Sequence, residues 1–421
     1  MQQSSRIHWL TLGQLFLSGI GFLLFAAGGA VLLLMGVSSL FGPQAGSSTS
    51  AQVLPFLSLM WVCGLVCLLL LPSILLSVMR LLDKPLPTWQ WKGEFRVASL
   101  AMIVWPLALI AGTYISRTGA LDWLLLPPLQ LLVVGLPLWW LIEFGRRGLQ
   151  GNGPQRTWGV LSAGLLVSPT LATLAELVAI ALVFLLAVIW LSSQPGAMQQ
   201  MTLLAQRLAN AGNDPEVYMR ILTPLATNPA ALIAVLLLVS GVIPLIEELL
   251  KPLGLWVLAG KKLTPAQGFI GGLLCGAAFA LLESLGSIAN PSGPEWLVLV
   301  LGRTGTGILH TVNTGLMGWA LASTWADHRY LRLAGTYLLA VGLHGLWNVF
   351  GVLMALPALF GTTPVTGIVA VFLRLGQIAP VVLVILTILL FTILFSSNRR
   401  LRADAESSKI DPPAQPLSPV D

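Results

Sequence analysis

The sequence predicts an all-α fold: a polytopic transmembrane helix bundle of about ten spans, with both termini in the cytoplasm. The chain has 421 residues, of which 56% are hydrophobic and 9% are charged, and its mean hydropathy is +0.87. Soluble domains carry roughly 25% charged residues, so this composition excludes a soluble globular protein. In lipid only helices and closed barrels satisfy the backbone, and the apolar runs here are too long for barrel strands.

Apolar stretches long enough to cross a bilayer, about 20 residues each, recur along the chain. We expect spans at roughly 9–40, 53–81, 97–115, 123–142, 158–191, 230–258, 268–289, 296–325, 333–354 and 367–395. Several of these stretches exceed the thickness of a bilayer, which predicts tilted helices or helices that extend into water.

The basic residues predict the orientation of these spans. With ten spans, most of the 22 Lys and Arg residues fall on the same side of the membrane as the N-terminus. Cytoplasmic loops carry an excess of Lys and Arg, so we expect both termini inside and a multi-pass protein of the cell membrane. The net charge of +6 comes from small clusters between apolar runs, which indicates a lipid bilayer and no nucleic acid as partner.

Four segments follow from this pattern. An N-terminal membrane region of five spans covers 1–193, and a second region of five spans covers 229–395. Between them, 194–228 is an extracytoplasmic loop whose apolar spacing predicts one or two short helices, with a turn at 213–216. The tail, 396–421, is polar and rich in Pro and Ser, so we expect it to be disordered.

The three cysteines do not indicate a redox or thiolate site. Cys63 and Cys67 are four residues apart within one apolar run, and Cys275 lies in another. An odd number of cysteines without a CxxC motif argues against disulfides and against a thiolate zinc site. We interpret them as small buried side chains.

Four carboxylates lie deep within apolar stretches: Glu176, Glu247, Glu248 and Glu283. A charged group at the bilayer centre costs roughly 2.5–3.5 kcal/mol, so such residues indicate function unless they only join helices by hydrogen bonds. For Glu176 alone, helix packing is the preferred interpretation. Glu247 and Glu248 point about 100° apart on a helix and must differ in role. Lys251 follows Glu247 by four residues and can neutralise it.

Polar groups continue on the next spans at a similar expected depth. His310 lies in the span after Glu283, and His344 and Asn348 share a face of the following span. A lone buried histidine is usually structural, whereas polar groups from four consecutive spans at one depth predict a shared, wet pocket. His8 and His328 lie at a span boundary and in a loop, so we expect neither to take part.

A shielded carboxylate near histidines can act as a general base on water. His310, His344 and Glu283 could hold a metal such as catalytic zinc. Without a metal, His344 and Asn348 would stabilise an oxyanion. Both routes hydrolyse an amide, and the spacing leaves them open. Motifs of other hydrolases, HExxH and GxSxG, are absent from the sequence. Deep Glu and His residues also suit a proton-coupled transporter or channel, and an inactive scaffold is a third reading.

These residues resemble the motifs of the PrsW family of membrane-embedded proteases, which is related to the CAAX and Abi proteases. The segment 247–251 resembles the EExxK motif, and Phe279 with Glu283 resembles the second motif. Arg303 and His310 resemble the third motif, and 344–348 resembles the HxxWN motif, including Trp347. Ser284 departs from the family, which often has Asn after the second-motif glutamate.

The resemblance implies an intramembrane endopeptidase that cleaves membrane-associated proteins such as anti-sigma factors. It implies a protease core at 229–395 and either a metal-dependent or a glutamate-type mechanism, with zinc as the candidate cofactor. The implied catalytic residues are Glu247, Glu248, Glu283, His310, His344 and Asn348, supported by Lys251, Phe279, Arg303 and Trp347. In this reading Glu247 or Glu248 activates water, and Asn348 steadies the oxyanion.

Overall fold

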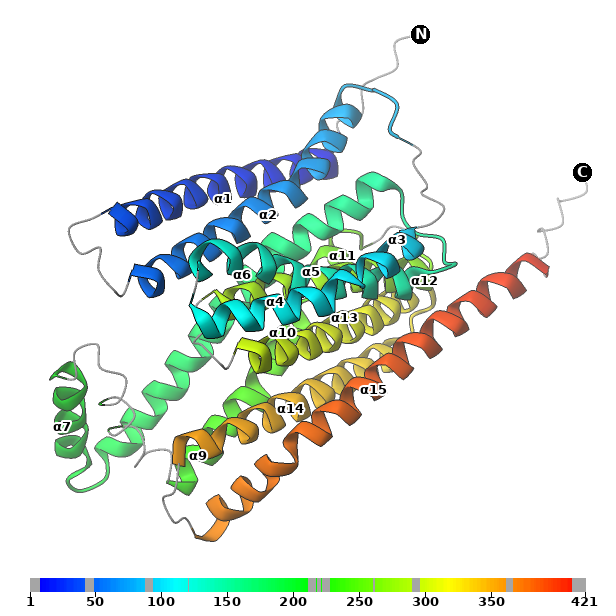
Figure 1. Cartoon of the computed structure of the whole chain (residues 1–421). Helices are drawn as coiled ribbons and strands as arrows, with labels where there is room; N and C mark the ends of the chain where they lie inside the picture. Colours follow the sequence, from blue (N-terminus) through cyan, green and yellow to red (C-terminus); the bar gives the residue numbers. More distant parts are fainter. Residues whose placement is uncertain are drawn as a thin grey trace, which may run out of the picture. The chain divides into compact units, whose positions relative to one another are not determined.

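Helices make up all regular structure in the described part of the chain (Figure 1). The computed structural model describes residues 8–41, 49–87, 94–119, 121–210, 217, 221, 228–259, 262–289, 296–360 and 366–410. The all-α prediction is confirmed for these residues, because the strands that a barrel would require do not occur among them.

The helices follow one another in this order: α1 (Trp9–Phe41), α2 (Thr49–Leu81), α3 (Glu94–Ala101), α4 (Val104–Thr118), α5 (Asp122–Arg146), α6 (Pro154–Ser192), α7 (Ala197–Asn210), α9 (Pro229–Leu237), the π-helix η1 (Leu238–Val242), α10 (Ile243–Leu250), α11 (Leu253–Trp256), α12 (Pro265–Ile288), α13 (Trp296–Asp327), α14 (Tyr330–Phe360) and α15 (Gly367–Ile410). Local signals place several starts. Asn228 caps α9 through Ala230 N–H and Ala231 N–H, and Thr264 forms a capping box with Gln267 at the start of α12.

Within the described residues, nine helical segments are long and apolar enough to cross a membrane, which confirms a polytopic protein. The expected span at 296–325 forms the single helix α13, but α13 is not among the nine. The reason is its composition, because Arg303, His310, Asn313 and several threonines and glycines lower its hydropathy. The orientation with both termini inside stays a prediction.

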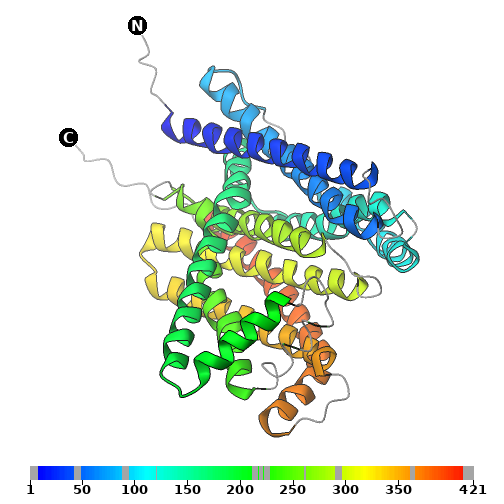
Figure 2. The ribbon, with the colours of Figure 1, turned by 90° about the vertical axis from the view of Figure 1, so that its left-hand side faces the viewer.

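The chain divides into two compact units that interleave along the sequence. One consists of 1–169, 251–336 and 389–421, and the other of 170–250 and 337–388. The expected boundaries at 193, 228 and 395 follow the chain linearly and do not coincide with this division. The first unit contains most predicted spans, with α1 beside α2 and with α5 in contact with α2, α4, α12 and α13 (Figures 1 and 2).

Glycines bring α12 and α13 close together in the first unit. A Cβ on Gly272 would collide with the carbonyl oxygen of Thr314, and a Cβ on Gly276 with that of His310. Small residues allow the backbones of membrane helices to approach in this way. The close approach of the two backbones also sets the distance between side chains of α12 and α13 that face each other near these glycines.

The second unit has its own small apolar core, formed by α9, the second half of α14 and the start of α15. Its buried members are Leu232, Leu353, Leu356, Phe360 and Val369. A Cβ on Gly376 of α15 would collide with the carbonyl oxygen of Leu353, so α14 and α15 also approach closely here. This core packs α9 against α14 and α15 within the second unit.

Two expectations about the segments outside the spans can be compared with the structure. The predicted short helix in the 194–228 loop is present as α7, while the turn at 213–216 lies outside the described residues. The expected disorder of the tail is wrong for 396–410, because α15 continues to Ile410. Asn398 donates to the carbonyl oxygens of Gly145 and Arg147, and Leu401 is buried, so tertiary contacts hold this polar sequence in a helix. Residues 411–421 lie outside the described part.

All three cysteines are free.

Candidate active site

The predicted site residues lie on four helices and the turn after one of them. Glu247 and Glu248 are on α10, Phe279 and Glu283 on α12, Arg303 and His310 on α13, and His344, Trp347 and Asn348 on α14; Lys251 directly follows α10. Glu248, Lys251 and His310 are fully buried, and Glu247 and His344 are nearly so. These groups form two constellations, one in each compact unit.

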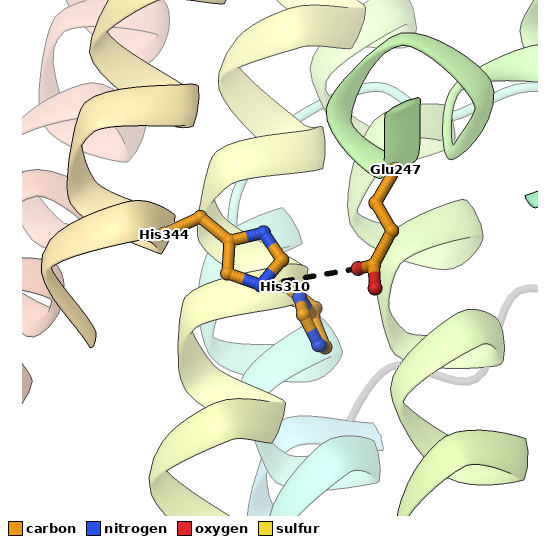
Figure 3. A group of neighbouring side chains, drawn as sticks. All are labelled: Glu247, His310 and His344. Carbon is orange, nitrogen blue, oxygen red and sulfur yellow. Dashed lines mark ion pairs between the residues drawn. The ribbon is translucent and has the colours of Figure 1, made fainter. Parts of the chain in front are cut away.

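In the second unit, His344 lies between the two adjacent glutamates. Its Nδ1 is 2.8 Å from Glu248 Oε1. Its Nε2 is 3.9 Å from Glu247 Oε2, the contact marked by the dashed line in Figure 3. Because a carboxylate only accepts hydrogen bonds, Nδ1 carries the proton and donates to Glu248. The distance of 3.9 Å is too long for a hydrogen bond between Nε2 and Glu247. Glu247 and Glu248 therefore make different contacts with His344, and the expected difference in their roles stays a prediction.

The π-helix η1 explains the position of Asn348 in this unit. Ile243 N–H donates to the carbonyl of Leu238, five residues earlier, and Pro244 has no N–H, so Val239 C=O lacks a donor from its own helix. Asn348 Nδ2 donates to this carbonyl at 2.9 Å. Gly345 makes the approach possible, since a Cβ there would collide with the carbonyl oxygen of Ser240. The amide of Asn348 thus holds α14 against the turn that precedes Glu247.

In the first unit, His310 pairs with the other deep glutamate. His310 Nε2 is 2.7 Å from Glu283 Oε2, and Arg303 Nη2 is 2.8 Å from the same oxygen. Arg303 Nε also donates to Ser284 Oγ at 3.3 Å. Ser284, the departure from the family motif, therefore contributes an acceptor that helps to direct Arg303 at Glu283.

Lys251 lies on the opposite side of the His310 ring. Its Nζ is 2.8 Å from His310 Nδ1 and 4.8 Å from the centre of the Phe279 ring, whose edge-to-face contact with His310 completes the cluster. An ammonium group only donates, so Nδ1 of His310 is an acceptor and Nε2 carries the proton that is donated to Glu283. The expected pairing of Lys251 with Glu247 stays a prediction.

Both histidines share one arrangement. Each donates a ring N–H to a carboxylate, Glu248 or Glu283, and each keeps a lone pair on its other nitrogen. Metal-binding histidines in proteins have this arrangement, in which a carboxylate fixes the tautomer and the ring orientation. Among the described residues, the buried groups of the kinds that bind metal ions include Glu247 and His344 of the second unit and His310 of the first. Glu283 does not belong to this group, because its Oε2 already accepts from His310 and Arg303.

Three further residues were weighed in the sequence analysis. Glu176 is half-buried on α6, and its packing role stays a prediction. His8 and His328 are exposed, as expected. Sequence reasoning did not foresee the π-helix. Its signal was Pro244, whose missing N–H leaves a carbonyl of the preceding turn to be satisfied by another helix.

A multi-span helical protein that buries charged groups is expected to use them, because their insertion is costly. Carboxylate–histidine pairs buried among apolar helices are groups that a membrane-embedded hydrolase can use. The family model described as PrsW family intramembrane metalloprotease matches residues 158–376, more than half of the chain. The chain belongs to this family and is an intramembrane metalloprotease. No match was found among curated proteins or solved structures.

The match begins at residue 158 and so includes α6 and the loop that contains α7, both of which precede the expected protease core at 229–395. The family acts as peptidases on substrates in the membrane, which supports the protease reading of the sequence over a proton-coupled transporter or channel.

Proposed function

We propose that Glu247, His310 and His344 hold the catalytic metal ion of this protease, and that Glu248 and Glu283 orient the two histidines. The observation that carries the proposal is the matched hydrogen bonding of the histidines: each donates to a carboxylate and keeps a lone pair at its other nitrogen. One carboxylate and two imidazoles with an open position are the donor set of many catalytic zinc sites, so we propose zinc.

The contact between Glu247 and His344 supports a cation at this place. With the proton on Nδ1, the lone pair of His344 Nε2 lies 3.9 Å from the Glu247 carboxylate. A metal cation would attract both of these acceptors. Two ligands of one zinc ion at 2.0–2.1 Å are separated by about 3.3 Å, so a small adjustment would admit the ion.

Lys251 has a consistent role in this scheme. Its ammonium group lies at His310 Nδ1, the nitrogen with the lone pair, and so keeps the ring in the tautomer that binds a metal. For His310 Nδ1 to serve as a metal ligand, Lys251 Nζ would have to leave that nitrogen. The Phe279 ring, already 4.8 Å from Nζ, gives the ammonium an electron-rich face nearby.

In peptide hydrolysis, each of the remaining residues has a proposed role. A bound zinc ion would supply polarisation of the scissile carbonyl and a lower pKa of water. One oxygen of Glu247 faces His344, and the other accepts a proton from the attacking water. Glu247 returns this proton to the nitrogen of the leaving amine as the C–N bond breaks. Glu248 keeps the proton on Nδ1 of His344 throughout, and Arg303 keeps Glu283 directed at His310.

Asn348 receives a different role from the oxyanion binding first expected. Its amide donates to Val239 C=O at 2.9 Å, so we propose that it positions η1 and, through it, Glu247. The substrates we propose are membrane-associated proteins, anti-sigma factors among them, which the resemblance implies.

The test is metal content together with cleavage. Wild-type protein, Glu247→Gln, His344→Ala and the exposed control His328→Ala are purified, their zinc is measured by elemental analysis, and cleavage of single-pass substrates is followed. We expect about one zinc ion per chain in wild type and His328→Ala and almost none in His344→Ala. Full activity of metal-free wild type would instead establish a glutamate-type mechanism.

A further inference from the structure

A cavity of about 830 Å³ lies in the first compact unit, and none of the residues proposed for catalysis lines it. Its walls are the first turns of α1 and α6, the end of α2, and α11. Ligand cavities commonly have volumes of roughly 300–1,000 Å³, so this one has room for a small amphiphile or part of a lipid.

The lining combines two cations with apolar walls. Arg80 in the last turn of α2 and Arg156 in the first turn of α6 both line the cavity and are exposed. Leu17, Val257 and Leu258 supply apolar surface, and the lining contains no Asp or Glu. A ligand that satisfies both parts carries a negative charge at one end and hydrocarbon at the other.

Polar contacts between three helices fix the shape of the cavity. Gln155 Nε2 donates to Thr11 Oγ1 at 3.0 Å, which joins α6 to α1. Gln14 Nε2 donates to Ser73 Oγ at 2.9 Å, and Ser73 lies 2.8 Å from Ser18 Oγ, which join α1 to α2. The two arginines are therefore carried by helices that are already tied together, so binding does not have to assemble the site.

The cavity lies at the ends of helices that are long and apolar enough to cross a membrane. α1 begins at Trp9, which is 73% exposed and lines the cavity, and α2 ends at Leu81 next to Arg80. Tryptophan is enriched at the membrane–water interface, and basic pockets between membrane helices bind anionic lipid head groups. Charge and position together favour a lipid over a soluble anion.

We propose that this cavity binds an anionic glycerophospholipid, with the phosphate between Arg80 and Arg156 and an acyl chain against the apolar wall of α1 and α11. Guanidinium groups suit this head group because they bind phosphate oxygens in pairs. The proposal does not depend on the metal site.

The experiment measures lipid retained by the purified full-length protein. The protein is incubated with equal amounts of phosphatidylglycerol and phosphatidylcholine with the same acyl chains, and bound lipid is measured by native mass spectrometry. Glycerol 3-phosphate serves as the head group alone. We expect retention of phosphatidylglycerol, and about 30-fold less in the double variant Arg80→Gln/Arg156→Gln, the factor typical of two basic side chains near an anionic surface.

A second variant fills the cavity without changing its charge. Gly13 lines it, and a Cβ there meets no atom within 4 Å, so Gly13→Phe directs a ring into the open space. Gly28→Phe is the matched control, because Gly28 has the same open surroundings on α1 and does not line the cavity. Arg399→Gln/Arg400→Gln is the control for charge, since both arginines are exposed on α15.

We expect Gly13→Phe to lose the lipid and both controls to keep it, with unchanged thermal unfolding. Three results would overturn the proposal: equal retention of phosphatidylcholine, wild-type retention by Arg80→Gln/Arg156→Gln, or displacement of the lipid by an equal concentration of glycerol 3-phosphate. The last would identify a phosphate site that does not need a lipid.

Discussion

His344 donates its Nδ1–H to Glu248 Oε1 at 2.8 Å, and both side chains are almost completely buried. This hydrogen bond decides which nitrogen of His344 has a lone pair and in which direction it points. It also distinguishes two adjacent glutamates, because Glu248 accepts from Nδ1 and Glu247 lies 3.9 Å from Nε2. The predictions below change this pair, its counterpart at His310 and the helix contacts that position them.

Glu248→Gln removes the charge that holds the proton on Nδ1 of His344 and keeps the size of the side chain. We expect metal affinity to fall by about 10–100-fold, the usual effect of changing a partner of a metal-binding histidine. Metal titration of the purified protein checks this, with the exposed Glu406→Gln as control. Wild-type affinity of Glu248→Gln would rule out an orienting role for Glu248.

Arg303→Lys replaces a guanidinium that reaches both Glu283 Oε2 and Ser284 Oγ by a single ammonium that cannot hold both in the same geometry. We expect kcat/KM to fall about tenfold, whereas Ser284→Ala, which removes only the longer bond of 3.3 Å, changes it about threefold. Steady-state cleavage kinetics measure both. A larger loss for Ser284→Ala than for Arg303→Lys would contradict the role of Arg303 at Glu283.

Asn348→Ala leaves the carbonyl of Val239 without its donor, so η1 and the adjoining α10 lose their fixed position. An unmade buried hydrogen bond costs about 1–3 kcal/mol, and we expect activity to fall by about 10–100-fold. Pro244→Ala restores a backbone N–H near this carbonyl. The double variant Pro244→Ala/Asn348→Ala should therefore recover part of the activity in the same cleavage assay. If Asn348 binds the oxyanion instead, the second substitution will recover none.

Gly276→Ala introduces a Cβ that collides with the carbonyl oxygen of His310, so α12 and α13 must separate. We expect a loss of about 1–3 kcal/mol in the free energy of unfolding and a weaker Glu283–His310 contact, seen as reduced activity. Gly286→Ala on the same helix is the control, because its Cβ meets no atom within 4 Å. Thermal unfolding in detergent compares the two, and equal stability would show that the close approach is not required.

The sequence alone determined the fold class and the identity of the chemical groups. Long apolar runs with few charges leave helices as the structure that satisfies the backbone in lipid, so the polytopic bundle followed from composition and length. Burial in those runs is costly, which predicts a functional role for Glu247, Glu248, Glu283, His310 and His344. The prediction of a disordered tail was wrong for 396–410, because this segment has no apolar pattern to indicate a helix. Tertiary contacts such as that of Asn398 hold it in α15.

The tertiary structure decided which of these groups contact each other. Helical periodicity gives the direction of a side chain around its own axis, but not the rotation or separation of two helices. For this reason the sequence proposed Glu283 as a metal ligand, whereas the fold directs Glu283 at His310 and Arg303 and leaves Glu247 facing His344. The π turn and the glycines of α12 and α14 set those rotations and distances. A backbone carbonyl without its own donor needs a second helix to donate to it, and a glycine allows a close approach only where a second helix packs against it.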